Sequence, residues 1–302
     1  MAVSVPQRLL DLALQTGRPF GELLQHYALE RWLYRLSQSE HREQFTLRGA
    51  LMLAAGDLPV SRPTRDIDLL ADPGVGRAGV RPAVGAICAV AAPDDGLVFD
   101  PGSVRLSQMT DEDDHEGVRA RFRGRLGTTS LAMQVDVGFG DVVTPGPVEL
   151  DYPALLDLPA PRLRAVNRET AVAEKFETMV RLGERDGRLQ DFCDLWLLAR
   201  HGAFDGRALG EAAAATFGRR GTALAGEPPR LTAAFAGEPE RQAAWNAYLR
   251  RLRLVGECGG LDEVAQLLRS FLGPLAGALA AGRPHDAHWP AGGPWQSGRI
   301  SA

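Results

Sequence analysis

Two carboxylates stand two residues apart in a stretch that otherwise resembles a buried strand. The stretch is RPTRDIDLLADP, residues 62–73, in which Asp66 and Asp68 alternate with apolar residues. Because side chains of a strand alternate between its faces, both carboxylates share one face. Two ionised carboxylates at this spacing repel each other, and burying them without compensation is costly. The stretch therefore requires either arginine partners, for which Arg62 and Arg65 are near, or a divalent cation.

A magnesium site is the interpretation that implies catalysis. Mg²⁺ prefers oxygen ligands and takes substrate phosphates as further ligands, and carboxylates on a rigid strand can hold two such ions for phosphoryl transfer. A third acid supports this interpretation, because Asp136 in LAMQVDVGFGD, residues 131–141, points away from its apolar neighbours in a second expected strand. If the two strands pair, Asp136 joins Asp66 and Asp68. A D-x-D triplet alone is weak support, since nucleotide-sugar glycosyltransferases use it as well.

A phosphate-binding turn is predicted shortly upstream of the two carboxylates. In LRGAL, residues 47–51, a glycine followed by a small residue stands where a helix is expected to begin. The backbone N–H groups at a helix start can bind a phosphate. Gly49 and Ala50 are the candidates, and ordinary turn geometry is the alternative explanation.

Lys175 is the only lysine among 34 Lys and Arg residues. Codon bias explains the abundance of arginine, but a compact ammonium group also does what a guanidinium cannot. Lys175 lies at the border of an apolar helical stripe, so its stem can be buried while its head reaches a cleft. In the next expected helix Asp191 and Asp194 are three residues apart on one edge. The alternatives are a solvated surface lysine, and acids placed favourably in the first helical turn.

The periodicity of apolar residues predicts a mixed α/β front followed by a helical back. The front begins with interrupted helix over 5–37 and continues with strands and one further helix over 75–92. The acidic run DEDDHEG, residues 111–117, is expected to be a solvated hairpin tip, with a loose metal site as the alternative. After a Pro-rich connector over 145–161, helices are predicted over 168–183, 189–201, 206–217 and 228–280. The fold class is α+β, with domains at 1–160 and 161–282 and an extended or disordered tail at 283–302.

Bulk composition excludes several classes of protein. The chain of 302 residues has no apolar run long enough to span a membrane and no recognisable signal peptide. Its three cysteines are widely spaced and suit a reducing cytoplasm. The net charge of −4 gives no global attraction to nucleic acid. A local arginine face is nevertheless expected, because Arg119, Arg121 and Arg123 alternate with apolar residues. We expect a monomeric cytoplasmic protein.

These motifs together resemble a known family. A Gly-small pair, then TRDIDLL, then a third Asp on a later strand, is similar to the nucleotidyltransferase superfamily that includes DNA polymerase β. FTLRGALML, RPTRDIDLL and EKFETMVRLGERDGRLQDFCDLWLLA, the last at residues 174–199, resemble AbiEii/AbiGii-type nucleotidyltransferase toxins of type IV toxin–antitoxin systems. The resemblance covers residues 45–199. It implies a polymerase β-like core with a mixed sheet, followed by a helical domain, with the active site between them.

The resemblance also implies roles for individual residues. Two Mg²⁺ ions would bind the carboxylates and an NTP substrate, while the late D-x-x-D and the single lysine complete the site. Ala50 lacks the hydroxyl that the family often has at this position, so any contact there comes from the backbone. The implied metal ligands are Asp66, Asp68 and Asp136; the further catalytic residues are Lys175 and Asp191; the further nucleotide-binding residues are Gly49, Ala50, Thr64 and Asp194.

The resemblance favours the 3′ end of tRNA as acceptor, which would block translation, and it implies a neutralising antitoxin of the DNA-binding repressor type. Three other readings stay open at this point. The chain could modify a protein hydroxyl, act as a D-x-D glycosyltransferase, or bind without catalysis. A glycosyltransferase would have a longer Rossmann-like unit before its D-x-D than the roughly 65 mostly helical residues found here.

Overall fold

The computed structural model of the chain describes residues 4–56, 62–109, 117–183, 188–224 and 228–298. The chain divides into two compact units. The first unit comprises Met1–Gly56, Pro63–Gly140 and Pro147–Ala165, and the second comprises Asp57–Arg62, Asp141–Gly146 and Val166–Ala302. Most of the acidic run at 111–117 lies outside the described residues. The expected division after residue 160 therefore differs from the observed one chiefly in two short segments that belong to the second unit.

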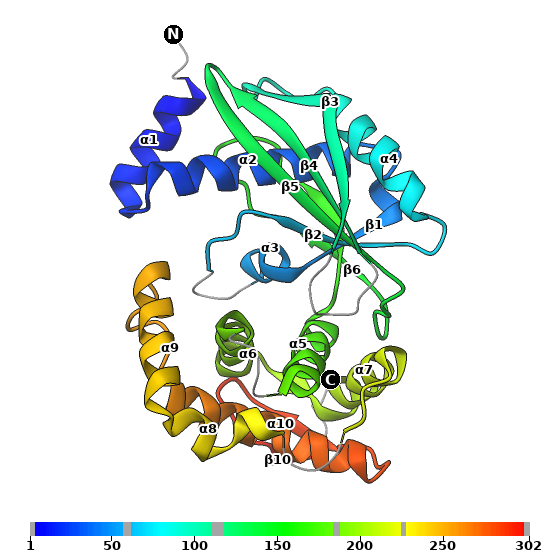
Figure 1. The fold of residues 1–302 in the computed structure, drawn as a ribbon, viewed down its shortest axis with the longest axis vertical. Helices are drawn as coiled ribbons and strands as arrows, with labels where there is room; N and C mark the ends of the chain where they lie inside the picture. Colours follow the sequence, from blue (N-terminus) through cyan, green and yellow to red (C-terminus); the bar gives the residue numbers. More distant parts are fainter. Residues whose placement is uncertain (1–3, 57–61, 110–116, 184–187, 225–227, 299–302) are drawn as a thin grey trace. The chain divides into compact units, whose positions relative to one another are not determined.

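A mixed sheet of seven strands forms the first unit (Figure 1). Its order is β3-β4-β5-β2-β1-β7-β6. The pairs β2–β5 and β1–β7 are parallel, and the other neighbouring pairs are antiparallel. The strands are β1 Phe45–Arg48, β2 Ile67–Ala71, β3 Leu97–Gln108, β4 Gly117–Leu126, β5 Thr129–Phe139, β6 Val148–Asp151 and β7 Arg162–Ala165.

Four described helices of the first unit accompany this sheet, and α2 and α4 pack against its strands. They are α1 Val5–Thr16, α2 Phe20–Ser37, α3 Gly49–Ala54 and α4 Arg77–Ala89. In Figure 1, α2 passes behind β4 and β5, and α4 lies beside β3, against which it packs. Strand β4 alternates as expected: Val118, Ala120 and Phe122 are buried on the helix side. The ring of Phe122 lies 6.0 Å from that of Trp32 in α2. The arginines between these residues take the other face.

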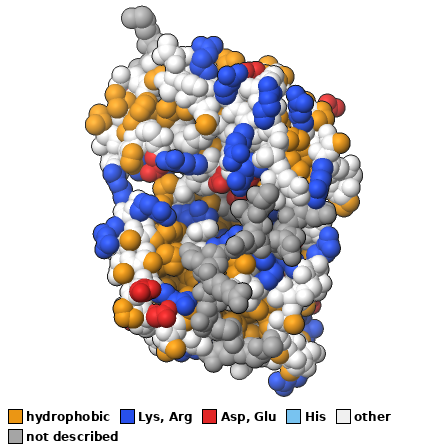
Figure 2. All heavy atoms as spheres, viewed as in Figure 1, with side chains coloured by type: hydrophobic (Ala, Val, Ile, Leu, Met, Phe, Trp, Pro, Cys, Tyr) orange, Lys and Arg blue, Asp and Glu red, His pale blue; other side chains and the backbone are white. Residues whose placement is uncertain are grey.

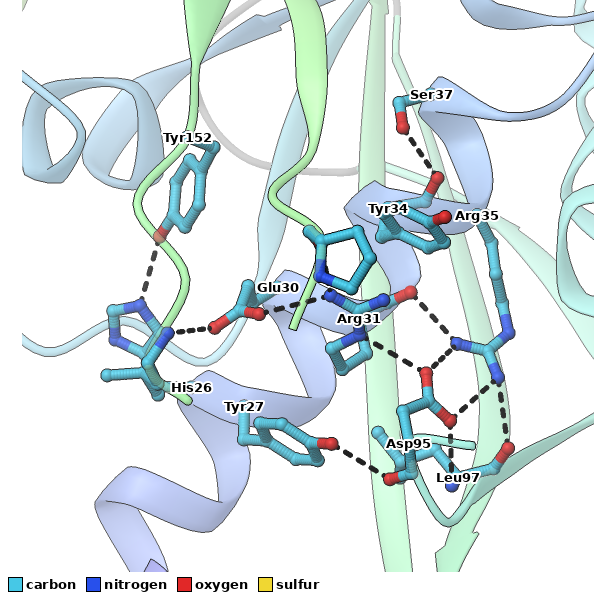
Figure 3. Close-up of polar contacts among 12 residues, drawn as sticks. His26, Tyr27, Glu30, Arg31, Tyr34, Arg35, Ser37, Asp95, Leu97 and Tyr152 are labelled. Atoms are coloured by element: carbon cyan, nitrogen blue, oxygen red, sulfur yellow. Dashed lines mark hydrogen bonds and ion pairs between the residues drawn. The ribbon is translucent and has the colours of Figure 1, made fainter. Parts of the chain in front are cut away.

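A buried ionic network fixes α2 to the loops around it (Figure 3). The Arg35 guanidinium binds both oxygens of Asp95, at 2.7 and 3.1 Å, and Arg31 donates to the same carboxylate at 3.2 Å. Glu30 accepts from the N–H of Leu155 at 2.7 Å. Burial raises the pKa of Glu30, although the Leu155 N–H and Arg31 oppose that rise. Because these charges are buried, removing one member would leave an uncompensated partner.

The same helix carries a half-buried histidine. The His26 Nε2 and the Tyr152 hydroxyl lie 3.0 Å apart (Figure 3). Burial lowers the pKa of His26 to about 4, and the positive charge of Arg18 acts in the same direction. His26 is therefore neutral in the folded protein at neutral pH.

Helices make up most of the second unit, close to the expected positions. They are α5 Arg168–Leu182, α6 Leu189–His201, α7 Gly206–Arg220, α8 Ala233–Gly237, α9 Pro239–Leu252 and α10 Leu261–Ala280. Side chains cap three of the described helix starts: Asn167 accepts from the N–H of Thr170, Asp205 from that of Ala208, and Thr232 from that of Phe235. No helix among the described residues is long and apolar enough to cross a membrane.

Residues 283–298 of the C-terminal tail belong to the second unit and carry strands, whereas an extended or disordered tail was expected at 283–302. Strands β8 Phe204–Asp205, β9 Ala287–Trp289 and β10 Gln296–Ser297 form a three-stranded sheet. Trp289 is fully buried, its indole N–H donates to the carbonyl of Ala199 at 2.8 Å, and its ring lies 4.8 Å from that of Phe271. The Gly/Pro-rich composition predicted an extended chain. That prediction did not take into account that Trp289 can bury a large apolar side chain against the second unit.

Candidate active site

Four charged residues form one row across the sheet of the first unit. In the strand register, Asp68 of β2 is the direct neighbour of Asp136 of β5, on parallel strands. Asp136 is in turn opposite Arg119 of β4, and Asp68 is opposite Arg48 of β1. Residues aligned in this way project from the same face of a sheet. The row therefore places two carboxylates side by side between two arginines, and the strand pairing expected from the sequence is present.

Asp136 is strongly held at its place in the row. Its side chain is buried, and its two oxygens accept from Nε and Nη2 of Arg119 at 2.8 and 2.7 Å. The amide of Gln134 donates to one of these oxygens at 3.2 Å. A carboxylate offers about four lone-pair positions. Three are used here, so Asp136 keeps the capacity to accept one more ligand.

Gly49 gives Asp68 the space it occupies. The backbone of Gly49 is in the left-handed region, with φ of +71°, and a Cβ at this position would lie 2.2 Å from the Asp68 Oδ2. Both the conformation and the contact therefore require glycine. At Gly138 a Cβ would lie 2.3 Å from the Arg48 Nη2, so a larger residue there would move the end of the Arg48 side chain. The neighbouring Ala50 is buried in α3.

Asp66 lies just before β2, in a bend rather than in the strand. Its Oδ1 accepts from the Thr64 hydroxyl at 2.5 Å. In the described part of the chain no three His, Cys, Asp or Glu residues are grouped as metal ligands. Mg²⁺ is commonly bound by only one or two protein carboxylates together with phosphates and water. The adjacent pair of Asp68 and Asp136 fits such a cation in donor type, whereas Asp66 as a third ligand stays a prediction.

Lys175 and the late acids form a second group, in the second unit. The Lys175 ammonium on α5 donates to Asp191 at 3.0 Å and to Asp194 at 2.7 Å, both on α6. Arg62 donates to both oxygens of Asp194, at 3.1 and 3.3 Å. The side chain of Asp194 is only 3% exposed, against 13% for Lys175. Two cations and two anions thus neutralise one another in a nearly dry cluster.

The electrostatics of this cluster keep Lys175 and Asp194 charged. Burial alone would lower the pKa of Lys175, but the carboxylates of Asp194 and Asp191 outweigh burial and raise it. Burial likewise opposes ionisation of Asp194, and the charges of Lys175 and Arg62 prevail and lower its pKa. Lys175 is therefore a fixed positive charge at any physiological pH.

Three arginines at these sites were not predicted as site residues. Arg62 was considered a partner for Asp66 and Asp68, but it bonds to Asp194 instead. Arg119 was expected only as part of an exposed face, and Arg48 was not singled out. Their partners depend on strand register and on tertiary contacts, which the local pattern of residues does not contain. The described residues thus group Gly49, Asp68 and Asp136 in the first unit, and Lys175, Asp191 and Asp194 in the second.

The fold and the family define the class of protein. The sequence pattern described as "Nucleotidyl transferase AbiEii toxin, Type IV TA system" matches residues 31–265. The chain therefore belongs to the AbiEii nucleotidyltransferase toxins of type IV toxin–antitoxin systems. It is a nucleotidyltransferase enzyme, as the resemblance had indicated.

Solved structures agree with this assignment at the level of the fold. The chain is similar to MenT4, a nucleotidyltransferase toxin from Mycobacterium tuberculosis, with 20% identity, a TM-score of 0.54, and 92% of this chain and 98% of that chain covered. It is also similar to JHP933 from Helicobacter pylori, with 14% identity, a TM-score of 0.50, and 86% and 92% covered. No curated protein sequence matches the chain. The expected α+β fold, with a mixed sheet and a helical C-terminal region, is confirmed.

Proposed function

We propose that this enzyme transfers a nucleoside monophosphate from an NTP to the 3′ end of an RNA of the tRNA class. The observation that carries the proposal is the pairing of Asp68 with Asp136 on adjacent parallel strands. Side-by-side carboxylates of this kind suit magnesium-dependent phosphoryl transfer. With Asp66, they are the residues that would hold two Mg²⁺ ions, which when bound would neutralise charge on the phosphates.

The protein's own groups would orient the reactants. The acceptor hydroxyl attacks the α-phosphorus, the bond to pyrophosphate breaks, and the hydroxyl proton leaves on the side of Asp136. Because Asp136 is fixed by Arg119 at 2.8 and 2.7 Å, its remaining acceptor capacity points in a constant direction. Preorganised polar groups of this type need no reorganisation during the reaction.

Lys175 would stabilise the leaving pyrophosphate as a point charge. Asp191 and Asp194 hold its ammonium, so they are positioning residues in this proposal. Arg62, which also binds Asp194, precedes Asp66 by only four residues in the chain.

The triphosphate would meet the start of α3 and the segment before β2. Gly49 and Ala50 would supply backbone N–H groups, as the first residues of that helix. Thr64 would supply a hydroxyl, which in the structure donates to Asp66. Any side chain at position 49 would displace the Asp68 carboxylate, so the glycine serves both the nucleotide and the metal ligand in this proposal.

An arginine row supports RNA as the acceptor. We use this name for Arg121, Arg123 and Arg125, which are exposed at alternate positions of β4, on the sheet face that carries Asp136. Figure 2 shows basic side chains gathered where β3, β4 and β5 lie in Figure 1. Alternate strand residues are about 6.8 Å apart, so the row can follow a phosphate backbone toward Asp136.

A transfer assay with labelled nucleotide distinguishes tRNA from protein as the acceptor. The purified protein is incubated with each α-labelled NTP and Mg²⁺, together with either total tRNA or an RNA-free protein lysate. The proposal expects label on the 3′ terminal nucleotide of tRNA and none on protein. Label on protein alone would make a protein hydroxyl the acceptor. A cognate antitoxin is implied by the family and should suppress the labelling when it is added.

A further inference from the structure

Two buried cysteines lie in contact within the second unit. The sulfur atoms of Cys193 and Cys258 are 3.1 Å apart. Cys193 lies in the middle of α6, and Cys258 lies in the segment between α9 and α10. They are 65 residues apart in the chain, so the contact is formed by folding and not by local sequence. Both are reduced in the structure.

We propose that Cys193 and Cys258 are a redox modification site, at which hydrogen peroxide converts the two thiols into an intramolecular disulfide. The sulfurs need to approach by about 1 Å to reach the bonded distance of about 2.05 Å. This proposal does not depend on the proposed acceptor or on the metal site.

The segment that carries Cys258 is suited to this small movement. The isolated bridge between Val255 and Cys258 and the bond from the Cys258 N–H to the carbonyl of Leu254 make a compact turn. Gly259 and Gly260 follow it and connect it to α10. Glycine permits backbone changes at low steric cost. The turn can therefore move toward α6 while the packed helix keeps its position.

The chemistry has a defined order. Cys258 is 6% exposed and Cys193 is fully buried, so Cys258 meets the oxidant first. The hydrogen bond between the two groups also lowers the pKa of Cys258, which favours its thiolate. The thiolate attacks peroxide, the O–O bond breaks, and a sulfenic acid and one water form after proton transfer. Cys193 then attacks the Cys258 sulfur and a second water leaves, so that two thiols and one peroxide give one disulfide and two waters.

The disulfide would have a structural consequence beside the lysine cluster. Cys193 directly precedes Asp194, which binds both Lys175 and Arg62. A covalent link at position 193 would restrict the motion of α6 at this point. It would also cross-link two distant parts of the second unit, which reduces the conformational freedom of the unfolded chain.

Thiol counting tests the proposal without any transfer assay. The full-length protein is treated with hydrogen peroxide, unfolded, and alkylated with N-ethylmaleimide before intact-mass measurement. The reduced protein has three thiols to alkylate, and the oxidised one should retain only one, at Cys88. A non-reducing peptide map should then join the peptides that contain Cys193 and Cys258. Dithiothreitol should restore all three thiols, and the oxidised protein should have a Tm several degrees higher.

Matched variants make the outcome decisive. C88S should still lose two thiols, because Cys88 lies in the first unit and bonds to the Trp32 indole. C193S and C258S should form no intramolecular disulfide. If either serine variant fails to fold, the wild-type peptide map still decides. Three alkylated thiols after oxidation, or a disulfide that includes Cys88 or a second chain, would overturn the proposal.

Discussion

The Lys175 ammonium donates to the carboxylates of Asp191 and Asp194, and these two bonds hold its positive charge at a fixed place. Two substitutions separate its charge from its shape. We expect K175M to lose about 10²-fold or more in transfer rate and about 3 kcal/mol in stability, because Asp191 loses its partner inside a nearly dry cluster. K175R should keep a Tm close to the wild type, since the positive charge remains.

The arginine variant should nevertheless transfer about 10-fold or more slowly, because a guanidinium fork does not place a point charge where an ammonium does. Urea denaturation and initial rates of labelled-NTP incorporation measure the two effects. Wild-type transfer by K175M would remove Lys175 from the site.

The lowered pKa of His26 leads to a prediction of how the stability of the protein depends on pH. Its folded pKa is about 4, below the ordinary value of 6.5, because its half-buried ring is partly removed from water and the positive charge of Arg18 acts in the same direction. Between these values the unfolded chain binds a proton and the folded protein does not. The free energy of unfolding should therefore decrease as the pH falls from 6.5 to 4, by up to about 3 kcal/mol.

H26Q should remove this component while keeping a polar partner for Tyr152. Urea titrations at several pH values in this window measure it as the difference between the two proteins. The raised pKa of Glu30 produces a slope of opposite sign, but Glu30 is present in both proteins and its contribution cancels. Parallel curves for wild type and H26Q would show that His26 is not buried in its neutral form.

At the scale of elements, the arginine row of β4 leads to a prediction about the affinity for RNA. Reversing the charge of the arginine row, in R121E/R123E/R125E, should raise the KM for tRNA and leave the rate at saturating tRNA largely unchanged. The logarithmic dependence of RNA affinity on salt should lose about one unit of slope for each phosphate contact removed. The matched control R162E/R207E/R219E changes the charge equally at other exposed positions. Equal losses in both triple variants would mean that net charge, not the β4 face, binds the RNA.

The buried tryptophan of the tail strand β9 leads to a prediction about the stability of the second unit. W289A removes a fully buried side chain that contacts Phe271, so we expect a loss of about 3–5 kcal/mol. The exposed neighbour Gln296 gives a control, Q296A, that should change stability by less than about 0.5 kcal/mol. Thermal unfolding measures both. If W289A unfolds at the wild-type temperature, the tail does not contribute to the core.

Local pattern was enough to predict most elements of this fold. The alternation of β4 and the helical stripe around Lys175 are properties of consecutive residues, and the structure has both. The position of Asp136 among apolar residues suggested a site shared with Asp68 on the condition that the two strands pair, and β2 and β5 do pair. Burial of Trp289 was missed because composition describes a segment on average, whereas one aromatic side chain can anchor it.

The charge partners could not be predicted, because they depend on register. Arg119 meets Asp136 through the β4–β5 pairing, and a shift by one residue would turn it to the other face. Arg62 binds Asp194 across 132 positions of the chain. The roles of the predicted site residues therefore rest on the resemblance and on their positions in the fold, and they remain to be measured.

At the scale of the whole molecule, a net charge of −4 means that RNA binding depends on where charges lie. Such a net charge gives no global attraction to RNA, and a local arginine row would then select the orientation of approach. A toxin of this family is expected to arrest growth when its antitoxin is absent. Growth arrest that requires the catalytic carboxylates would connect the chemistry to the biology.

The rate of nucleotide incorporation by D68N is the most direct test of the central claim, which is that the Asp68–Asp136 pair performs nucleotidyl transfer. The substitution keeps the size of the side chain and leaves Gly49 and Arg48 in place, so the fold should persist with wild-type stability or slightly more. We expect incorporation into tRNA to fall by about 10³-fold, with growth arrest abolished, while the control D151N, an exposed carboxylate of the same unit, behaves like the wild type. Incorporation by folded D68N at the wild-type rate would contradict the account.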